Sequence, residues 1–345
     1  MIILMKTDSS LADLSQVIRR VEEMGFSPRP YHGALRTVIG VMDGNLEKLE
    51  AVKDLPGVDN VTPLSSKFKL VSLDFQPEPT VVRLGGLKIG GPEFVVMAGP
   101  CAVENHDQLL ECARHVKACG GNVVRGGAFK PRTSPYSFQG LGEEGLQILA
   151  AAREETGLPV ITEVISPDSV PLVCRYADIL QIGARNMQNY ALLEAVGKAR
   201  TPVMLKRGLM STIEEMLLAA EYLMSNGNTQ VILCERGIRT FEKATRNTLD
   251  LSAVPVIKQS SHLPVIIDPS HAVGYVDYVE SMALAAAACG ADGIIVETHP
   301  RPAEAFSDGQ QSLDFPAFAG LMKKIAPVAA AVGRPLAGKP AISSA

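Results

Sequence analysis

The sequence predicts an α/β protein, a (β/α)8 TIM barrel preceded by a small ferredoxin-like α+β domain. The chain has 345 residues, more than one hydrophobic core usually spans. Eight apolar, β-rich runs follow one another after residue 92 at intervals of roughly 28 residues, whereas the first 65 or so residues alternate differently. We divide the chain into four parts: a ferredoxin-like domain, a linker with a barrel-capping hairpin, the barrel and a tail, at 1–65, 66–91, 92–335 and 336–345.

The amino-terminal part follows the order of the split ferredoxin-like unit, β-α-β-β-α-β. A helix is predicted over Leu11–Met24, where apolar residues recur at helical spacing, and Ser10 with Asp13 predicts a capping box at its start. The other predicted elements are strands near 1–6, 29–31, 37–42 and 58–61 and a helix over 45–54. Such a unit either regulates or oligomerises a protein, or simply supports packing, and both interpretations stay open.

The next segment is poorly periodic and predicts a linker followed by a short hairpin. The linker is indicated by Gln76-Pro77-Glu78-Pro79, and the residues at 81–91, VVRLGGLKIGG, alternate around a central Gly-Gly pair. Alternation around such a pair is typical of a β-hairpin. We expect this hairpin to cap the domain that follows it.

The barrel is predicted from apolar runs separated by helical segments. The runs begin at Phe94, Asn122, Pro159, Ile179, Pro202, Gln230, Pro264 and Gly293. Helical segments lie between them, for example at 107–118, 143–155, 213–224 and 276–288. Near-continuous apolar strands are typical of parallel sheets covered on both faces. An open doubly wound sheet is the alternative, but it seldom has eight parallel strands so evenly spaced.

Composition excludes several classes of protein. A net charge of −4 argues against nonspecific binding of nucleic acid. No apolar run approaches the roughly 18 residues that cross a membrane, and the first six residues are too short for a signal peptide. We therefore expect a cytoplasmic protein. Its six cysteines include no C-x-x-C pair, so we expect free thiols or a metal ligand rather than disulfides.

Residues 123–140 predict a site for anions. This segment combines glycines with three cations and three hydroxyls, which are Arg125, Lys130, Arg132, Thr133, Ser134 and Ser137. Freed backbone N–H groups, hydroxyls and guanidinium groups suit the oxygens of phosphates or carboxylates. A solvated basic loop is the alternative for an isolated run of cations.

The ends of the predicted strands strengthen the interpretation as an anion site. In a barrel enzyme the chemistry lies where strands end and βα loops begin, and polar or glycine residues, Glu163 among them, follow all eight runs. Like charges that converge in a net acidic chain repel one another unless anions are bound. The cations expected at this mouth are Arg125, Lys130, Arg132, Arg185, Lys206, Arg207 and Arg236.

A second set of residues, from the ends of strands one, seven and eight and from the loop after the eighth, predicts a metal site. It consists of Cys101, His271, Glu297 and Asp308. A thiolate, an imidazole and two carboxylates suit a divalent transition metal such as Mn, Fe, Co or Zn. The first and eighth strands become neighbours when the barrel closes. A lone strand-end cysteine is more often buried filler, so the prediction depends on that closure.

The motifs resemble those of the type Iβ 3-deoxy-D-arabino-heptulosonate 7-phosphate (DAHP) synthases, whose barrel carries a ferredoxin-like or ACT-like amino-terminal domain. The resemblance extends over roughly 92–332 and preserves the order of the motifs. They are KPRTSPYSFQG, QIGARNMQN, MLKRG, CERGIRTFE, DPSHAVG and VETHP. The sister 3-deoxy-D-manno-octulosonate 8-phosphate synthases share the barrel and much of the phosphoenolpyruvate site but carry a different loop in place of KPRTS.

The resemblance implies a transferase that condenses phosphoenolpyruvate with erythrose 4-phosphate, at the entry to the shikimate pathway. It implies phosphoenolpyruvate binding by Arg125, Lys130, Gly183, Ala184, Arg185, Lys206 and Arg236. It implies aldose phosphate binding by Arg132, Thr133 and Ser134. The implied ligands of one divalent metal ion are Cys101, His271, Glu297 and Asp308.

On that basis we expect Lys130 to act as general acid, Cys101 and His271 to act through the metal, and either Glu163 or the metal's ligand shell to activate water. The resemblance further implies a homo-oligomer, by the family's tendency a tetramer, and a domain at 1–65 gated by tyrosine or phenylalanine or by no ligand. Two alternatives are an octulosonate synthase that uses arabinose 5-phosphate and a noncatalytic amino-acid sensor.

Overall fold

The protein is described by a computed structural model, which covers residues 1–32, 36–41, 46–62, 67–131 and 134–338. It divides into two compact units, Met1–Pro79 with Ser260–His262 and Thr80–Gln259 with Leu263–Ala345. The first contains a four-stranded sheet and the second a closed eight-stranded barrel. The predicted fold class is confirmed.

The amino-terminal unit has the predicted β-α-β-β-α-β order. Its antiparallel sheet has the strand order β2-β3-β1-β4. The strands are β1 (Ile2–Met5), β2 (Pro28–His32), β3 (Thr37–Val41) and β4 (Val58–Thr62). Helix α1 (Leu11–Glu23) begins with the expected capping box, in which the Asp13 N–H donates to Ser10 Oγ at 3.1 Å and Ser10 N–H donates to the Asp13 carboxylate at 2.9 Å.

The second helix of this unit is shorter than predicted. Helix α2 (Leu46–Leu49) passes directly into a 3₁₀ turn, η1 (Glu50–Val52). In 3₁₀ geometry residues three apart lie on one face. Leu49 and Val52 are both fully buried, in the core that also contains Val17 and Ile39. The 3₁₀ turn therefore allows the side chains of Leu49 and Val52 to pack in the same core.

The barrel closes through parallel strands in the order β10-β11-β12-β13-β14-β7-β8-β9. The strands are β7 (Val95–Gly99), β8 (Val123–Arg125), β9 (Val160–Val164), β10 (Ile179–Ile182), β11 (Val203–Lys206), β12 (Val231–Glu235), β13 (Val265–Ile267) and β14 (Gly293–Glu297). All eight predicted runs contain one of these strands. The first pairs with the last over five residues, from Gly293 with Val95 to Glu297 with Gly99.

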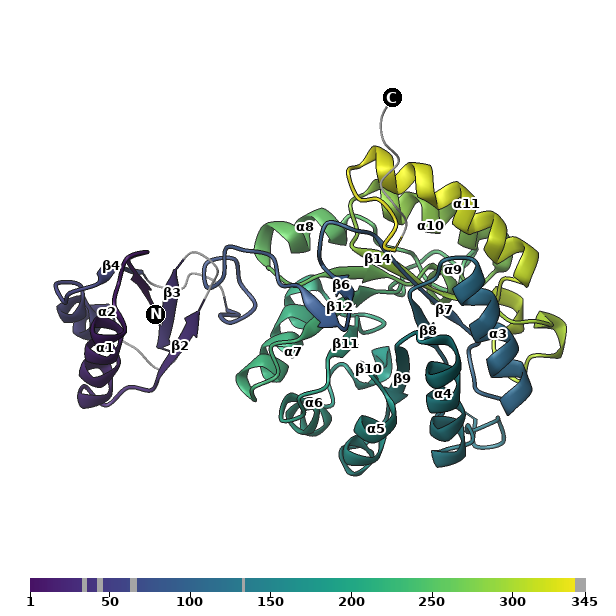
Figure 1. The fold of residues 1–345 in the computed structure, drawn as a ribbon, viewed down its shortest axis with the longest axis horizontal. Helices are drawn as coiled ribbons and strands as arrows, with labels where there is room; N and C mark the ends of the chain where they lie inside the picture. Colours follow the sequence, from purple (N-terminus) through teal and green to yellow (C-terminus); the bar gives the residue numbers. More distant parts are fainter. Residues whose placement is uncertain (33–35, 42–45, 63–66, 132–133, 339–345) are drawn as a thin grey trace. The chain divides into compact units, whose positions relative to one another are not determined.

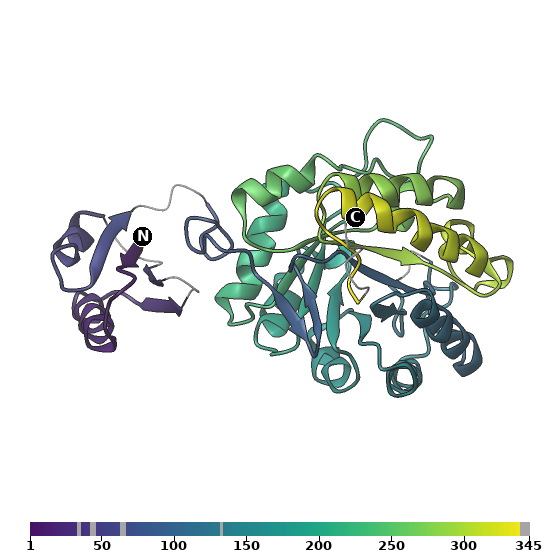
Figure 2. The ribbon, with the colours of Figure 1, turned by 45° about the horizontal axis from the view of Figure 1, so that its top comes forward.

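Helices surround these strands, as Figure 1 and Figure 2 show from two directions. They are α3 (His106–Ala118), α4 (Glu143–Thr156), α5 (Val170–Tyr176), α6 (Tyr190–Gly197), α7 (Ile213–Ser225), α8 (Ala253–Ser260), α9 (Pro269–Val273), α10 (Val276–Ala288) and α11 (Phe315–Ala331). Short 3₁₀ turns lie at η2 (Pro167–Ser169), η3 (Ala184–Asn186), η4 (Pro302–Glu304) and η5 (Gly309–Gln311). No helix in the described part of the chain combines the length and apolar character needed to cross a membrane.

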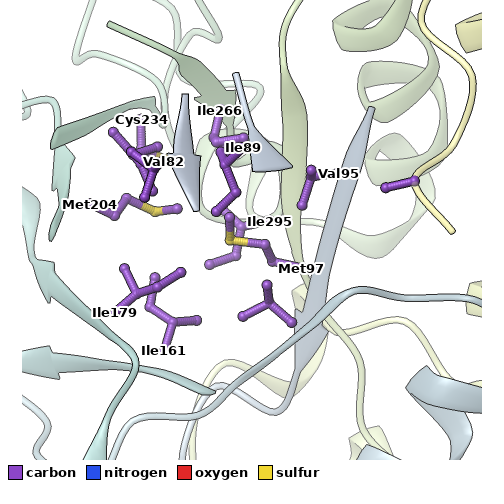
Figure 3. Packing of buried hydrophobic residues seen from close by; sticks show 13 residues of the cluster. Val82, Ile89, Val95, Met97, Ile161, Ile179, Met204, Cys234, Ile266 and Ile295 are labelled. Carbon is purple, nitrogen blue, oxygen red and sulfur yellow. The ribbon is translucent and has the colours of Figure 1, made fainter. Parts of the chain in front are cut away.

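The predicted hairpin is present and packs on the barrel core. It consists of β5 (Val82–Leu84) and β6 (Leu87–Ile89). Figure 3 shows Val82 and Ile89 among the interior side chains of the barrel, such as Met97 and Met204, and all of them are almost fully buried. The hairpin therefore belongs to the hydrophobic core of the barrel.

The chain after α11 also contributes to the barrel, contrary to the predicted start of a tail at residue 336. Leu336 and Ala337 are buried. Phe94 N–H donates to the carbonyl of Pro335 at 2.8 Å, and Ala337 N–H donates to the carbonyl of Phe94 at 3.0 Å. These apolar residues pair with the segment before β7, so the packed chain extends further than its composition indicates. Residues 339–345 lie outside the described range.

Candidate active site

A polar cavity of about 450 Å³ opens among the βα loops of the barrel. Most of the predicted site residues line it: Arg125, Lys130, Ser134, Glu163, Gly183, Ala184, Arg185, Lys206, Arg236, His271 and Asp308. They lie at or beyond the carboxyl ends of strands that are far apart in the sequence. Because the carboxyl ends of parallel barrel strands meet at one face, these side chains are brought together by the fold.

The four predicted metal ligands lie together. Each of Cys101, His271, Glu297 and Asp308 offers one ligand atom, and all four atoms lie within 4.8 Å of one another. Cys101 and Glu297 are almost completely buried, whereas the side chains of His271 and Asp308 are partly exposed. A thiol, an imidazole and two carboxylates at this spacing fit a divalent transition metal.

His271 is oriented by a buried carboxylate. Its Nδ1 lies 2.8 Å from Asp268 Oδ2, and its backbone N–H donates to Asp268 Oδ1 at 2.9 Å. Asp268 also forms an ion pair with Lys206. Burial alone would raise the pKa of Asp268, but the His271 and Lys206 charges hold that pKa well below its usual range. An imidazole held through Nδ1 by a carboxylate presents Nε2 to a metal, as is common in metalloproteins.

Lys130 lies against the cysteine. Its Nζ donates to the Cys101 carbonyl at 2.9 Å and lies 3.0 Å from Cys101 Sγ. Gly127 makes this approach feasible, because a Cβ at that position would lie 2.6 Å from Lys130 Cδ and 2.9 Å from the Cys101 carbonyl oxygen. Burial, followed by the Glu297 charge, raises the pKa of the Cys101 thiol to about 11. Without a bound cation the thiol is therefore protonated at neutral pH.

Arg125 and Glu297 form a buried ion pair beside the ligand cluster. Arg125 Nη1 donates to Glu297 Oε1 at 2.5 Å and to the Pro100 carbonyl at 3.1 Å. Burial opposes ionisation of Glu297, but the His271 and Arg125 charges outweigh it and lower the pKa of Glu297 to about 2. The Arg125 Nε–H is buried and finds no acceptor among the described residues.

Two other predicted cations line the cavity without a carboxylate partner among the described residues. Arg236 is buried and donates only to the carbonyls of Gly237 and His271. Burial lowers the pKa of Arg236, and an anion beside it would reverse that shift. Arg185 is exposed at the rim. Together with Arg125 they make the cavity suitable for anionic ligands.

Gly183, which directly follows β10, fits against Glu163 of the neighbouring strand β9. A Cβ at Gly183 would lie 2.0 Å from Glu163 Oε1, so glycine is required for the carboxylate to occupy this position. Gln181 Nε2 donates to the other carboxylate oxygen of Glu163 at 3.3 Å. The Glu163 side chain is thereby held at the wall of the cavity.

Arg207 does not point into the cavity, contrary to prediction. Its Nη1 donates to Glu235 Oε2 and Asp250 Oδ2, both at 2.8 Å, and its Nε donates to the carbonyl of Ser211 at 2.8 Å. The reason is the alternation of side chains along a strand. Lys206 ends β11 facing the barrel interior, so the next residue faces away from it.

Several residues at the cavity were not predicted. Arg239, Arg246 and Asn247 come from the long loop between β12 and α8, and Gln181 from β10 itself. Arg239 stands within the motif CERGIRTFE, so the motif was a signal for it. Arg246 and Asn247 lie beyond that motif and far from a strand end. Two predicted residues, Arg132 and Thr133, lie outside the described range.

Comparisons with known proteins identify the family of this chain. A sequence profile described as the DAHP synthetase I family matches residues 75–330, and one described as the DAHP synthase ferredoxin-like domain matches residues 1–66. The chain belongs to the DAHP synthetase I family. The predicted family and enzyme class are thereby confirmed. The family is metal-dependent, which agrees with the ligand cluster.

Individual relatives agree. The phospho-2-dehydro-3-deoxyheptonate aldolase of Thermotoga maritima is 50% identical over 334 residues, which cover 96% of this chain and 99% of the relative. Its 1.92 Å crystal structure matches with 49% identity and a TM-score of 0.78 over 97% of this chain and 98% of that one. The 2-dehydro-3-deoxyphosphooctonate aldolase of Geobacter sulfurreducens is 32% identical over 271 residues, 73% of this chain and 98% of the relative.

The buried contacts of Arg207, which the sequence did not predict, lead to a prediction about stability. Replacing Arg207 by methionine leaves Glu235 buried without its cation, so we expect the free energy of unfolding to fall by about 3–5 kcal/mol. The measurement is urea denaturation followed by circular dichroism. Arg185→Met is the matched control and should change stability by less than about 0.5 kcal/mol, because Arg185 is exposed. Equal stability of the two variants would contradict a structural role for Arg207.

Proposed function

We propose that this barrel catalyses the condensation of phosphoenolpyruvate with erythrose 4-phosphate, giving DAHP and inorganic phosphate. One observation carries the proposal: four side chains suited to hold a metal ion lie together at the edge of a cavity lined by converging cations. The reactants bring two phosphates and one carboxylate, and the cations match that charge. A noncatalytic sensor would need neither the cluster nor the cations.

Phosphoenolpyruvate is bound, in this proposal, by Arg125, Lys130, Gly183, Ala184, Arg185, Lys206 and Arg236. Among the described residues, Arg236 is buried against carbonyls without a carboxylate partner, and Arg125 lines the cavity, which supports this assignment. Guanidinium groups fixed by protein carbonyls keep their orientation, so binding of the phosphate and carboxylate costs little further ordering.

The aldose phosphate binds at the loop that carries the KPRTS motif. Arg132, Thr133 and Ser134 supply a guanidinium and two hydroxyls for its phosphate. Ser134 lines the cavity, which supports this placement for the one residue of the three that lies in the described range.

Cys101, His271, Glu297 and Asp308 hold one divalent ion, which we propose to be Mn, Fe, Co or Zn. When bound, such an ion supplies Lewis-acid polarisation of the aldehyde carbonyl. The carboxylate of Asp268 keeps His271 in the ligating orientation, and Arg125 keeps Glu297 ionised.

Lys130 and Glu163 move protons in this proposal. The Lys130 ammonium lies at the cysteine ligand and faces the cavity, so it can donate a proton to the alkoxide that forms from the aldehyde as phosphoenolpyruvate C3 attacks. Water then adds to C2, and Glu163 at the cavity wall accepts its proton. The hemiketal phosphate collapses with loss of inorganic phosphate. The arginines hold the phosphate and carboxylate during these steps.

The choice of aldose tests the proposed reaction. We expect rapid consumption of phosphoenolpyruvate with erythrose 4-phosphate and at least about 100-fold lower kcat/KM with arabinose 5-phosphate. The measurement is the loss of phosphoenolpyruvate absorbance with phosphate release as a second readout. Preference for arabinose 5-phosphate would assign the chain to the octulosonate reaction, and inertness toward both would remove the proposal.

Replacement of Lys130 tests the general acid. We expect Lys130→Met to lower kcat by about 100-fold or more while changing either KM by only a few fold, because the group acts on the forming alkoxide. Steady-state kinetics measure the split. Lys88→Met, an exposed lysine of the hairpin, is the control and should leave both constants unchanged. An unaltered kcat in Lys130→Met would refute the role.

Metal removal tests the ligand assignment. Chelation should abolish activity, and added Mn²⁺ should restore it in the wild type but not in Cys101→Ala, which lacks the thiol ligand. Cys174→Ala, a half-buried thiol away from the cavity, is the control and should recover like the wild type. Full recovery of Cys101→Ala would exclude Cys101 as a required ligand.

Oligomeric state and effector remain predictions from sequence. We propose a homo-oligomer, a tetramer by family tendency, and an aromatic amino acid as the candidate effector of residues 1–65. The support is the match of residues 1–66 to the ferredoxin-like domain of DAHP synthases.

A further inference from the structure

Asp308 differs from the other three members of the ligand cluster in its backbone support. Cys101, His271 and Glu297 stand at or shortly after strands, whereas Asp308 lies in the long connection between β14 and α11. Its φ of 54° is the only positive value found for a non-glycine residue in the described chain. A non-glycine residue keeps this left-handed backbone conformation when surrounding contacts fix the chain on both sides of it.

On its carboxyl side, Asp308 is tied to β14. The backbone N–H of Gln311 and the hydroxyl of Ser312 both donate to the Asp308 carbonyl at 3.2 Å. Gln311 Nε2 in turn donates to Glu297 Oε2 at 2.7 Å. These contacts hold the turn after Asp308 against one of the other ligands.

On its amino side, the contact is made by Glu104. Glu104 Oε1 accepts a hydrogen bond from the backbone N–H of Phe306 at 2.8 Å, and Glu104 Oε2 lies 3.4 Å from His299 Nε2. The backbone N–H of Arg301 donates to His299 Nδ1 at 3.0 Å, so the neutral ring carries its proton on Nε2 and donates to Glu104. The side chains of Glu104 and His299 are only 6% and 3% exposed, so their mutual contact is largely shielded from water.

Glu104 also belongs to the loop that carries the cysteine. It stands three residues after Cys101, shortly before helix α3. Cys101 Sγ lies 3.0 Å from Ser307 Oγ and 3.2 Å from Asp308 Oδ2. One short loop therefore presents one ligand and anchors the segment that presents another.

We propose that Glu104 is a positioning residue that fixes Asp308 for metal binding. This inference rests on the proposed metal site and adds a residue that touches neither metal nor substrate. Glu104 acts through the Phe306 N–H, two residues before Asp308, and through His299 at the start of the same connection. The Phe306 N–H and the His299 Nε2–H are both donors, so the two oxygens of one carboxylate can accept from both. In a Glu104→Gln variant the amide NH₂ group would face the N–H of His299, and the two donors could not form a hydrogen bond.

The test is metal binding by chelator-treated protein titrated with Co²⁺ alone. We expect Glu104→Ala to weaken Co²⁺ binding by about 10- to 100-fold and Glu104→Gln by about 3- to 10-fold, near the range seen for groups that orient metal ligands. The visible absorption of bound Co²⁺ should change as well, because it reports the ligands around the ion. Circular dichroism of the metal-free proteins checks folding, and if Glu104→Ala does not fold, Glu104→Gln decides.

Glu111 provides a matched control on helix α3, which follows the Glu104 loop. It also pairs with the connection after β14, through Arg301 Nη1 at 3.4 Å, but both side chains are about half exposed. Glu111→Ala and Glu111→Gln should bind Co²⁺ within twofold of the wild type. A folded Glu104→Gln with wild-type affinity and spectrum would overturn the inference. Failure of the wild type itself to bind Co²⁺ would instead count against the proposed metal site.

Discussion

The pairing of β14 with β7 is the constraint on which the site depends. It closes the barrel and sets Glu297 opposite Gly99, two residues before Cys101. Glu297 and Cys101 come from the last and the first strand of the barrel, and no local element could hold them together. Closure also buries both side chains, and burial of the Glu297 carboxylate costs free energy unless its charge is compensated. The polar contacts around the cluster follow from that requirement.

Some buried charges at the site are paired with an opposite charge and others are not, and this difference indicates function. The carboxylates beneath the mouth are paired, Glu297 with Arg125 and Asp268 with Lys206 and His271. Arg236, in contrast, is buried and has only carbonyl contacts among the described residues. A buried cation without a counter-charge destabilises a folded protein. Such a pattern is reasonable where a bound anion completes it, and the proposed substrates carry that charge.

The sequence predicted well whatever is fixed by strand order. Each of the eight apolar runs became a strand, and because parallel strands end at one face, polar residues at those ends could be assigned to one site. Prediction was weaker for the residue that follows the last residue of a strand. Arg207 was assigned to the mouth, but side-chain alternation turns it toward Glu235 and Asp250. Leu336 was assigned to a tail. It pairs with Phe94, and the sequence gives no sign of a contact between residues so far apart along the chain.

Loops set the limit of prediction for the site. Arg246 and Asn247 reach the cavity from the middle of a long connection, where spacing from a strand end carries no information. Asp308 is likewise remote from any strand end, and nothing local in the sequence places it beside Cys101. Its position depends on contacts from other loops, among them the buried carboxylate of Glu104. A ligand on a strand is oriented by the sheet, whereas a ligand on a loop needs anchors of its own, and these become visible only in three dimensions.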